Sequence, residues 1–467
     1  MIARIKSRLT PESIRAALMG PVYPAVIAVL VAVGGASGLE FYFNLLHTAL
    51  ILVALWFSKS IRPILISLVT YVMQVSVKNG PFYPNNSDFY YTGWRLPTVI
   101  VLGVLIIAGI AVFILKNKIY AKISFKSTPM LLSMLIFSTT LMTNGLFSGE
   151  WQSADIIFGF ANAFVYTFVF ILVYHGFSDE ESTEEIAKYF AYISALIALV
   201  ISFELLVHIL TADNVFAPGG SIIKESMALG WGIWNLVGVS LSVLIPVIFY
   251  GIEKGRYPWL YFAAATVAWM AAVITMSRNA LIFSTLAYAS SVIIFAFVGK
   301  NKRAFRIIAL SGAVLVAAVA VIFFDKIYTV LGDYFSRGMS DNGRFELWST
   351  AWDNFISRPI FGVGFYGFEI SDKILTPFGP LTKQAHNTVL QLLSATGITG
   401  LLAYGYYRFT SLRPVFRRPT LMKTMLAMSI AVFLGGSLLD NFVFNIYPTF
   451  YYSIALAIIH RAGSEEK

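Results

Sequence analysis

Long apolar runs recur along the whole chain and are separated by short polar connections. An apolar run of about eighteen or more residues can cross a bilayer as a helix. We therefore expect an all-α polytopic membrane protein with about 12–14 transmembrane helices. The fourteen expected spans are 22–38, 41–58, 61–77, 96–115, 129–147, 154–175, 187–210, 229–250, 259–276, 280–298, 305–324, 386–407, 422–438 and 442–459. Asp440 and Asn441 interrupt the last two, so twelve or thirteen spans are the alternative.

The alternation of spans and short connections stops between Asp325 and Ala385. A connection of about sixty residues is long for a segment without structure, and such segments usually carry function. The chain thus divides into three parts: about eleven N-terminal transmembrane helices (1–324), one large loop outside the membrane (325–385) and about three C-terminal helices (386–467).

Aromatic residues recur within this loop at intervals of three and four residues. They are Phe345, Trp348, Trp352 and Phe355. The spacing predicts an amphipathic helix that lies in the plane of the membrane surface, with Arg344 at its N-terminal end. Pro359 should end this helix, and the Gly362–Gly364 turn should let the backbone approach another segment closely.

The composition excludes several classes of protein. The chain is 58% hydrophobic and 12% charged, whereas a soluble domain carries about 25% charged residues. There is no cysteine, which excludes a disulfide framework, a thiol nucleophile and a thiolate metal site. The net charge of +10 is better explained by the basic bias of cytoplasmic loops than by nucleic-acid binding.

The basic residues predict an orientation in the membrane. With the N-terminus in the cytoplasm, most of the 34 Lys and Arg residues fall on inside segments, including Arg408, Arg413, Arg417 and Arg418. A retained first span is favoured over a cleaved signal peptide, since such signals normally precede exported domains. Both termini are then cytoplasmic, and the large loop, like the residues proposed below for the site, faces the extracytoplasmic side.

A polar stripe opens the span after the large loop. Asn387, Gln391 and Ser394 fall at i, i+4 and i+7 of a helix, with His386 and Gly397 beside them. A polar stripe at the end of a membrane helix usually faces protein or water. Histidine can accept a proton near neutral pH, so His386 is a candidate catalytic residue; an ordinary interfacial histidine is the alternative.

Two arginines are expected on the same side as His386. Arg278 lies at the junction of two long apolar spans, where a guanidinium is costly unless it finds an anion or water, or extends to lipid headgroups. Arg344 combines its charge with the positive end of the amphipathic helix. Since arginine binds phosphate through two hydrogen bonds, the pair could hold a diphosphate while His386 handles a hydroxyl. No carboxylate cluster has metal-binding spacing, so we expect no metal and no cofactor.

Glu204 and His208 form an i,i+4 pair inside an apolar span. Ionisable pairs within the membrane are candidates for substrate binding, although a neutralised structural pair is the equal alternative. Asn44 with His47, Lys224 with Glu225, and Asp440 with Asn441 are weaker examples of the same pattern.

Four motifs in register are similar to those of the bacterial O-antigen ligase and polymerase family. His386-Asn387 with Gly397 and Gly400 resembles its H-[NSQ]-x9-G-x-x-[GTY] signature. The segments 234–246, which contains Asn235, 276–280, which contains Arg278, and 343–368, which contains Arg344, resemble its other elements. The resemblance covers about residues 230–405. Ala395 stands where relatives often carry an acidic residue, so no carboxylate role is assigned there.

The resemblance implies a lipid-dependent glycosyltransferase of the GT-C type in the bacterial cytoplasmic membrane. Arg278 and Arg344 would bind the diphosphate of an undecaprenyl-diphosphate-linked glycan, and His386 would activate or position an acceptor hydroxyl. Asn387, Gln391, Asn235, Glu204 and His208 are the expected substrate-binding residues. The acceptor would be a lipid A–core glycan for a ligase or a second lipid-linked glycan for a polymerase, and transfer would invert the anomeric centre without nucleotide sugar or nucleic acid.

Two other functions remain as alternatives. A lipid-linked oligosaccharide flippase also has twelve to fourteen helices, but it would be expected to show two repeated halves around a charged cavity, and no internal repeat is visible. A peptidoglycan polymerase of the shape and division family would use a carboxylate in the outer loop. Asp341, Asp353 and Glu369 leave that open, although the His386 signature argues against it.

Overall fold

The structure is a computed structural model of the 467-residue chain. It describes residues 10–74, 93–147, 156, 159–160, 164–212, 215–216, 223, 226–227, 229–322, 344–364, 374–376, 379–381, 385–444 and 446–466. Lys224, Glu225, Asp341 and Glu369, considered above, lie outside these residues.

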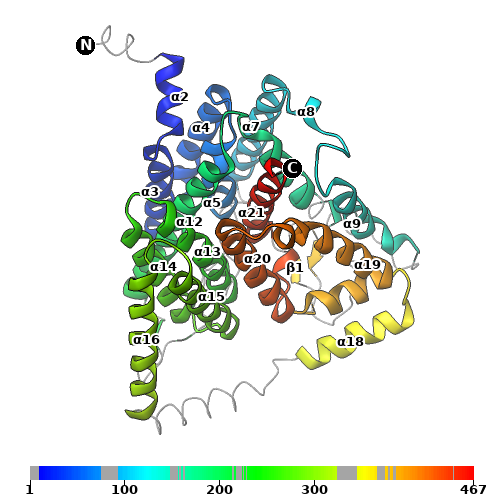
Figure 1. The fold of residues 1–467 in the computed structure, drawn as a ribbon. Coiled ribbons are helices and arrows are strands. Elements are labelled where there is room, and N and C mark those ends of the chain that lie inside the picture. Colours follow the sequence, from blue (N-terminus) through cyan, green and yellow to red (C-terminus); the bar gives the residue numbers. More distant parts are fainter. Residues whose placement is uncertain are drawn as a thin grey trace.

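The N-terminal half is helical throughout its described part (Figure 1). Its elements are α2 (Pro11–Met19), α3 (Val22–Ser37), α4 (Glu40–Phe57), η1 (Arg62–Ile64), α5 (Leu65–Gln74), α7 (Arg95–Lys116), α8 (Ile119–Lys122), α9 (Leu131–Thr143), η2 (Asn144–Phe147), η3 (Phe164–Val169), α11 (Phe170–Gly176) and α12 (Thr183–Thr211).

The C-terminal half adds longer helices and one small hairpin. Its elements are α13 (Trp234–Lys254), α14 (Pro258–Ile274), α15 (Arg278–Phe297), α16 (Lys302–Ile322), α18 (Arg344–Ser357), β1 (Ile374–Thr376), β2 (Gly379–Leu381), α19 (Thr388–Arg417), α20 (Leu421–Leu439), η5 (Phe442–Phe444) and α21 (Ile446–Glu465). The two strands pair antiparallel, with Ile374 opposite Leu381.

Each of the fourteen expected spans overlaps a helix, which confirms the all-α polytopic fold class. Among the described residues, seven helices are long and apolar enough to cross a membrane. They are α4, α7, α12, α13, α15, α19 and α20. An eighth span results if α2 and α3, bent by 65°, are counted together, and three shorter apolar helices include α9 and α14. The larger number of crossings remains a prediction.

Helix α13 lies at the centre of the bundle and packs against α12, α14, α15 and α20 (Figure 1). Its apolar sequence is buried on all sides, as expected for a helix without a polar face. Gly238 permits a close approach to α15, since a Cβ there would lie 2.3 Å from the Cβ of Ala280. Asn279 donates a 3.0 Å hydrogen bond to the carbonyl of Gly436, which ties α15 to α20. These contacts hold three helices of the candidate site together.

The structure corrects the expected end of one span. Helix α19 continues to Arg417, so Arg408 lies inside a helix rather than in a cytoplasmic loop. Its side chain is buried, and its guanidinium lies 4.4–4.9 Å from the ring centres of Tyr404, Tyr407 and Tyr452. Cation–π contacts explain how an apolar span accommodates this charge, which the hydropathy pattern alone assigned to water.

Candidate functional site

Four helix ends meet at the candidate site: the N-termini of α13, α15 and α19 and the C-terminus of α20. A row of side-chain hydrogen bonds connects them. His386 Nδ1 lies 2.8 Å from Asp440 Oδ1, and Asn235 donates to Asp440 Oδ2 at 3.2 Å. Ser277 Oγ in turn donates to Asn235 Oδ1 at 2.8 Å. The row thus connects the histidine to the residue that directly precedes Arg278.

Asp440 is the centre of this row and is only 8% exposed. Burial by itself would raise the pKa of its carboxyl group. The hydrogen bond and charge of His386, the 2.9 Å bond from the Asn441 N–H and the charge of Arg344 act in the other direction. The net result is a pKa below the ordinary value, so Asp440 is an anion at neutral pH.

The charge of Asp440 determines the tautomer of His386. An ionised carboxylate has only acceptor atoms, so His386 Nδ1 must carry the hydrogen of the 2.8 Å bond. In the neutral ring, Nε2 is then the nitrogen that can accept a proton. The His386 side chain is 40% exposed, whereas that of Asp440 is 11% exposed. The partly exposed imidazole therefore offers a basic nitrogen, while the buried carboxylate of Asp440 binds the other nitrogen of the ring.

The backbone of His386 lies in the left-handed region, with φ of 49°. For a residue other than glycine this costs on the order of 1–3 kcal/mol, and such strain is typical of functional sites. The neighbouring Ala385 is held on both sides: Trp348 Nε1 donates to its carbonyl at 2.8 Å, and its N–H donates to Gln391 Oε1 at 2.8 Å. These bonds hold the histidine in its strained position.

Asn387 and Gln391 support the same segment. Asn387 is the N-cap of α19, since its side-chain oxygen accepts the N–H groups of Val389 and Leu390 at 3.0 Å. Its Nδ2 donates to the carbonyl of Leu438, which ties α19 to the end of α20. Gln391 is 2% exposed and also accepts a bond from Asn441. Their described bonds are with protein, so the substrate-binding role expected for both remains a prediction.

Arg278 and Arg344 are the first residues of α15 and α18. Each charge therefore adds to the positive end of a helix dipole, which favours an anion. Arg278 is exposed and Arg344 is partly exposed. The effect of Arg344 on the pKa of Asp440 places it within electrostatic range of the histidine pair. Arg278 thus follows the last residue of the hydrogen-bonded row, and Arg344 acts on the carboxylate at its centre.

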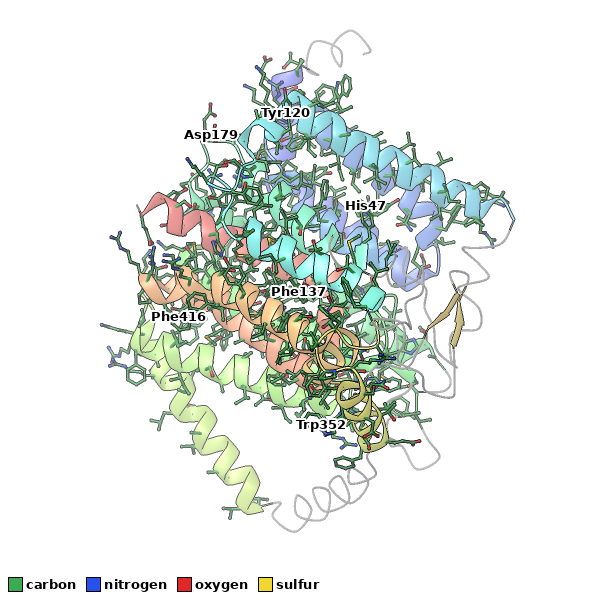
Figure 2. The ribbon with its side chains drawn as sticks, turned by 90° about the vertical axis from the view of Figure 1, so that its right-hand side faces the viewer. His47, Tyr120, Phe137, Asp179, Trp352 and Phe416 are labelled. Atoms are coloured by element: carbon green, nitrogen blue, oxygen red, sulfur yellow. The ribbon has the colours of Figure 1, made fainter. Side chains whose placement is uncertain are left out.

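Helix α18 confirms the expected amphipathic helix, which ends at Ser357 before Pro359. Phe345 and Trp352 are 66% and 49% exposed, as suits a membrane surface. Figure 2 shows Trp352 on this helix. Trp348 instead points inward to Ala385. Phe345 and Trp352 thus give the helix an exposed apolar face, whereas Trp348 helps to hold Ala385 next to His386.

The Gly362–Gly364 turn approaches another backbone, as the sequence predicts. Its N–H groups at Val363 and Gly364 donate to the carbonyls of Ser394 and Ala395 at 2.9 and 3.0 Å. In return, Ile398 donates to the carbonyl of Pro359 at 2.9 Å. The loop therefore docks directly on α19.

This docking requires a break in α19 at Gly397, whose φ of 62° and ψ of −160° are not helical. A Cβ at Gly397 would lie 2.5 Å from the backbone of Ile360. Asn144 of η2 donates to the carbonyl of Thr396 and, at 2.8 Å, to Thr399 Oγ1. The Gly397 of the sequence motif thus marks the place where the loop is inserted into the helix.

Glu204 and His208 belong to a different group of contacts. Trp231 donates to Glu204 Oε2 at 2.9 Å, and His208 Nε2 lies 2.6 Å from the carbonyl oxygen of Ser226. Both partners lie in the segment before α13. These contacts lie outside the row of hydrogen bonds at the candidate site. The substrate-binding role expected for Glu204 and His208 therefore remains a prediction.

Asp440 is the residue that sequence reasoning missed. The sequence marked Asp440 and Asn441 only as a weak polar pair that interrupts two short spans. An acidic residue inside an apolar region is the signal that could have found it. Its pairing with a histidine 54 positions away is not visible in any local pattern.

Within the described residues, no group of three or more His, Asp or Glu side chains could hold a metal ion.

Residues 262–405 match the protein family described as O-antigen ligase. This segment extends from α14 into α19 and includes Arg278, Arg344 and His386, but not Asn235 or Asp440. A search of curated proteins found no match.

Proposed function

Because residues 262–405 confirm the likeness to the O-antigen ligase family, we propose that this protein transfers a glycan from undecaprenyl diphosphate to a sugar hydroxyl. The match supports a glycosyltransferase-like role in cell-surface polysaccharide assembly for a multi-pass bacterial membrane protein. The observation that carries the proposal is the 2.8 Å bond from His386 to Asp440, which leaves a basic nitrogen available.

In the proposed reaction, His386 Nε2 removes the proton of the acceptor hydroxyl as its oxygen attacks the anomeric carbon. The bond between that carbon and the diphosphate oxygen breaks, and undecaprenyl diphosphate leaves with the electron pair. A single displacement inverts the anomeric centre. Asp440 stabilises the imidazolium that forms, and such general base catalysis contributes about 10²–10⁴-fold to rate.

Arg278 and Arg344 supply the remaining chemistry. Their guanidinium groups bind the diphosphate through paired hydrogen bonds and stabilise the negative charge that grows on it as it leaves. With two fixed cations at helix N-termini, the leaving group needs no divalent ion. Excess EDTA should accordingly leave transfer intact, and strict dependence on added Mg²⁺ or Mn²⁺ would contradict this part of the proposal.

The proposed site faces the extracytoplasmic side of the cytoplasmic membrane, with both termini in the cytoplasm. Lipid-linked glycans are the energy-rich donors on that side. The acceptor is a lipid A–core glycan or a second lipid-linked glycan, and the two differ only in the molecule that presents the hydroxyl.

The test uses purified protein in liposomes with an undecaprenyl-diphosphate-linked glycan and each acceptor. We expect a new glycosidic bond of inverted configuration and one undecaprenyl diphosphate released per transfer, detected by mass spectrometry and NMR. His386→Ala should lower the rate by at least about 10²-fold in folded protein. Full turnover by this variant would remove the assigned role, and glycan translocation without bond formation would indicate a flippase instead.

A further inference from the structure

A cavity of about 630 Å³ lies at the opposite end of α19 from His386. It opens between the ends of α19 and α21 and the segment before α9. Its lining residues are Pro129, Met130, Thr410, Arg413, Pro414, Arg417, Arg418, His460, Gly463, Ser464 and Glu466. The lining thus combines three guanidinium groups, one imidazole and one carboxylate with two hydroxyl groups.

The single carboxylate of this lining is already neutralised. Lys423 Nζ lies 2.6 Å from Glu466 Oε2, and Arg418 donates to the backbone carbonyl of Glu466 at 2.6 Å. Within the described chain, neither Arg413 nor Arg417 has a side-chain hydrogen bond or ion pair. Arg413 and Arg417 are therefore two cations of this cavity that pair with no anionic side chain of the described chain.

The two arginines lie four residues apart and project from the same face of α19. Like charges at this spacing repel each other, and an anion bound between them removes the repulsion. Pro414 lies between them, and a Cβ at Gly463 would lie 3.2 Å from its ring. Helix α21 therefore packs closely against Pro414, and Arg413 and Arg417 on either side of it are exposed.

A neighbouring cavity of about 530 Å³ contains cations that are bonded to protein groups. It also contains a lysine and an arginine, but Lys122 pairs with Asp179 at 3.1 Å. Arg461 donates to the carbonyls of Ser178 and Glu181. Lys122 and Arg461 thus have protein partners, whereas no such partner of Arg413 or Arg417 is found among the described residues.

The length of α19 predicts that the two arginines lie at a membrane surface. The 20 residues from Ile398 to Arg417 extend about 30 Å as a helix, which matches the thickness of the hydrocarbon core. Phe416 is 80% exposed beside Arg417 and lies at the outer edge of the molecule (Figure 2). An exposed apolar ring next to arginines suits the boundary between the acyl chains and the headgroups. The cavity thus opens where phosphate groups of lipids are concentrated.

We propose that this cavity binds the phosphate-bearing headgroup of an anionic membrane phospholipid. Arg413 and Arg417 hold the phosphate through charge-assisted hydrogen bonds, and the acyl chains run along the apolar surface beside Phe416. The lipid belongs to the leaflet opposite the candidate glycan site, which is the cytoplasmic leaflet in the predicted orientation.

The test measures lipid retention by the full-length protein, independently of glycan transfer. Purified protein in detergent is incubated with equal amounts of phosphatidylglycerol and phosphatidylethanolamine, and bound lipid is counted by native mass spectrometry. The wild type should retain phosphatidylglycerol preferentially. The double variant Arg413→Gln/Arg417→Gln should retain about tenfold less, because both charge-assisted bonds are lost.

Two further variants control for charge and folding. Arg303→Gln removes an exposed arginine at the start of α16, outside the cavity, and should retain as much lipid as the wild type. Arg413→Lys/Arg417→Lys keeps both charges and should retain an intermediate amount of lipid. The compact ammonium group of lysine cannot donate the two parallel hydrogen bonds of a planar guanidinium.

Unchanged retention by the double glutamine variant would overturn the proposal, as would an equal loss in Arg303→Gln. A separate titration with inorganic phosphate distinguishes the source of the anion. If phosphate raises the melting temperature of the wild type but not of the double variant, while phosphatidylglycerol is not retained, the site takes a free anion and the lipid assignment is wrong.

Discussion

The buried carboxylate of Asp440 is surrounded by donors on both oxygens. Oδ1 accepts from His386 and from the N–H of Asn441, and Oδ2 accepts from Asn235. A buried anion with its acceptor sites occupied is rigid, and this rigidity passes to the imidazole. At the scale of single residues, the proposed chemistry therefore depends on a side chain that does not itself touch the substrate.

Asp440→Asn should show whether Asp440 orients His386 for transfer or only supports the fold. The amide keeps the shape but loses the charge, so His386 no longer has an anionic acceptor. We expect the transfer rate to fall by about 10–100-fold, which corresponds to one hydrogen bond to a charged group. The measurement is kcat in the liposome assay, with Asp353→Asn on the exposed surface of α18 as the control. A normal kcat for Asp440→Asn would contradict the assigned role.

The pH dependence of stability gives the same variant a second readout. Since the pKa of Asp440 is lowered on folding, its ionised form stabilises the protein above the ordinary pKa of about 3.9. That contribution is lost as the pH falls through the lower, folded-state pKa. The melting temperature of Asp440→Asn should thus lie below that of the wild type at neutral pH and approach it in stronger acid.

Arg344→Lys should impair transfer nearly as much as Arg344→Ala. Lysine keeps the charge but cannot offer two parallel hydrogen bonds to a diphosphate. Loss of one such stabilising group costs about 10²–10³-fold in kcat. Arg358→Lys, on the exposed segment after α18, is the matched control and should be neutral. If Arg344→Lys retained full activity, the charge alone would be sufficient.

At the scale of elements, the break in α19 allows the large loop to contribute to the site. Helix α18 contacts Ala385 through Trp348, and the turn that follows it is hydrogen-bonded to Ser394 and Ala395. These contacts lie on both sides of the first turns of α19. The loop and the helix therefore behave as one unit, with His386 between the contacts.

Gly397→Ala should disrupt this unit. A Cβ at Gly397 would meet the backbone of Ile360, and a positive φ adds on the order of 1–3 kcal/mol for a residue with a side chain. We expect lower thermal stability and weaker transfer. Gly405→Ala in the same helix has open space around it and should be neutral or stabilising by about 0.5–1 kcal/mol. Equal melting temperatures for the two variants would show that the docking is dispensable.

At the scale of the whole molecule, α13 collects the elements that carry the site. It packs against α15 and α20, and the ends of these three helices hold Asn235, Ser277 and Asp440. Helix α18 lies alongside α19 at the edge of the bundle (Figure 1). The buried helix α13 therefore holds the site together, while the amphipathic helix α18 contacts it through Trp348 and Ala385.

The absence of cysteine makes the predicted orientation simple to test. Ser349→Cys on α18 and Lys126→Cys before α9 introduce single thiols at exposed positions. In intact cells with a permeable outer membrane, a maleimide that cannot cross the inner membrane should label Ser349→Cys at once. It should label Lys126→Cys only after that membrane is opened. The reverse pattern would place the candidate site in the cytoplasm and end the proposal of a glycan transfer outside it.

The sequence by itself predicted the membrane fold and the three residues proposed to carry the chemistry. Hydropathy identifies spans because each residue in lipid contributes a transfer free energy that depends mainly on its own side chain. Arg278 and His386 were found because each lies in a short motif at the end of an apolar run, and Arg344 because it begins an amphipathic pattern within the large loop. The Gly362–Gly364 turn was predicted to approach another segment, but its partner was not.

The tertiary structure alone decided which helix ends are neighbours. The pairing of Asp440 with His386, the insertion of the loop at Gly397 and the burial of Arg408 among tyrosines all join residues on different elements or distant turns. Such contacts depend on how helices pack around α13, and packing is a property of complementary surfaces rather than of local composition. For this reason the sequence located the histidine proposed to act as the base but not the carboxylate bonded to it.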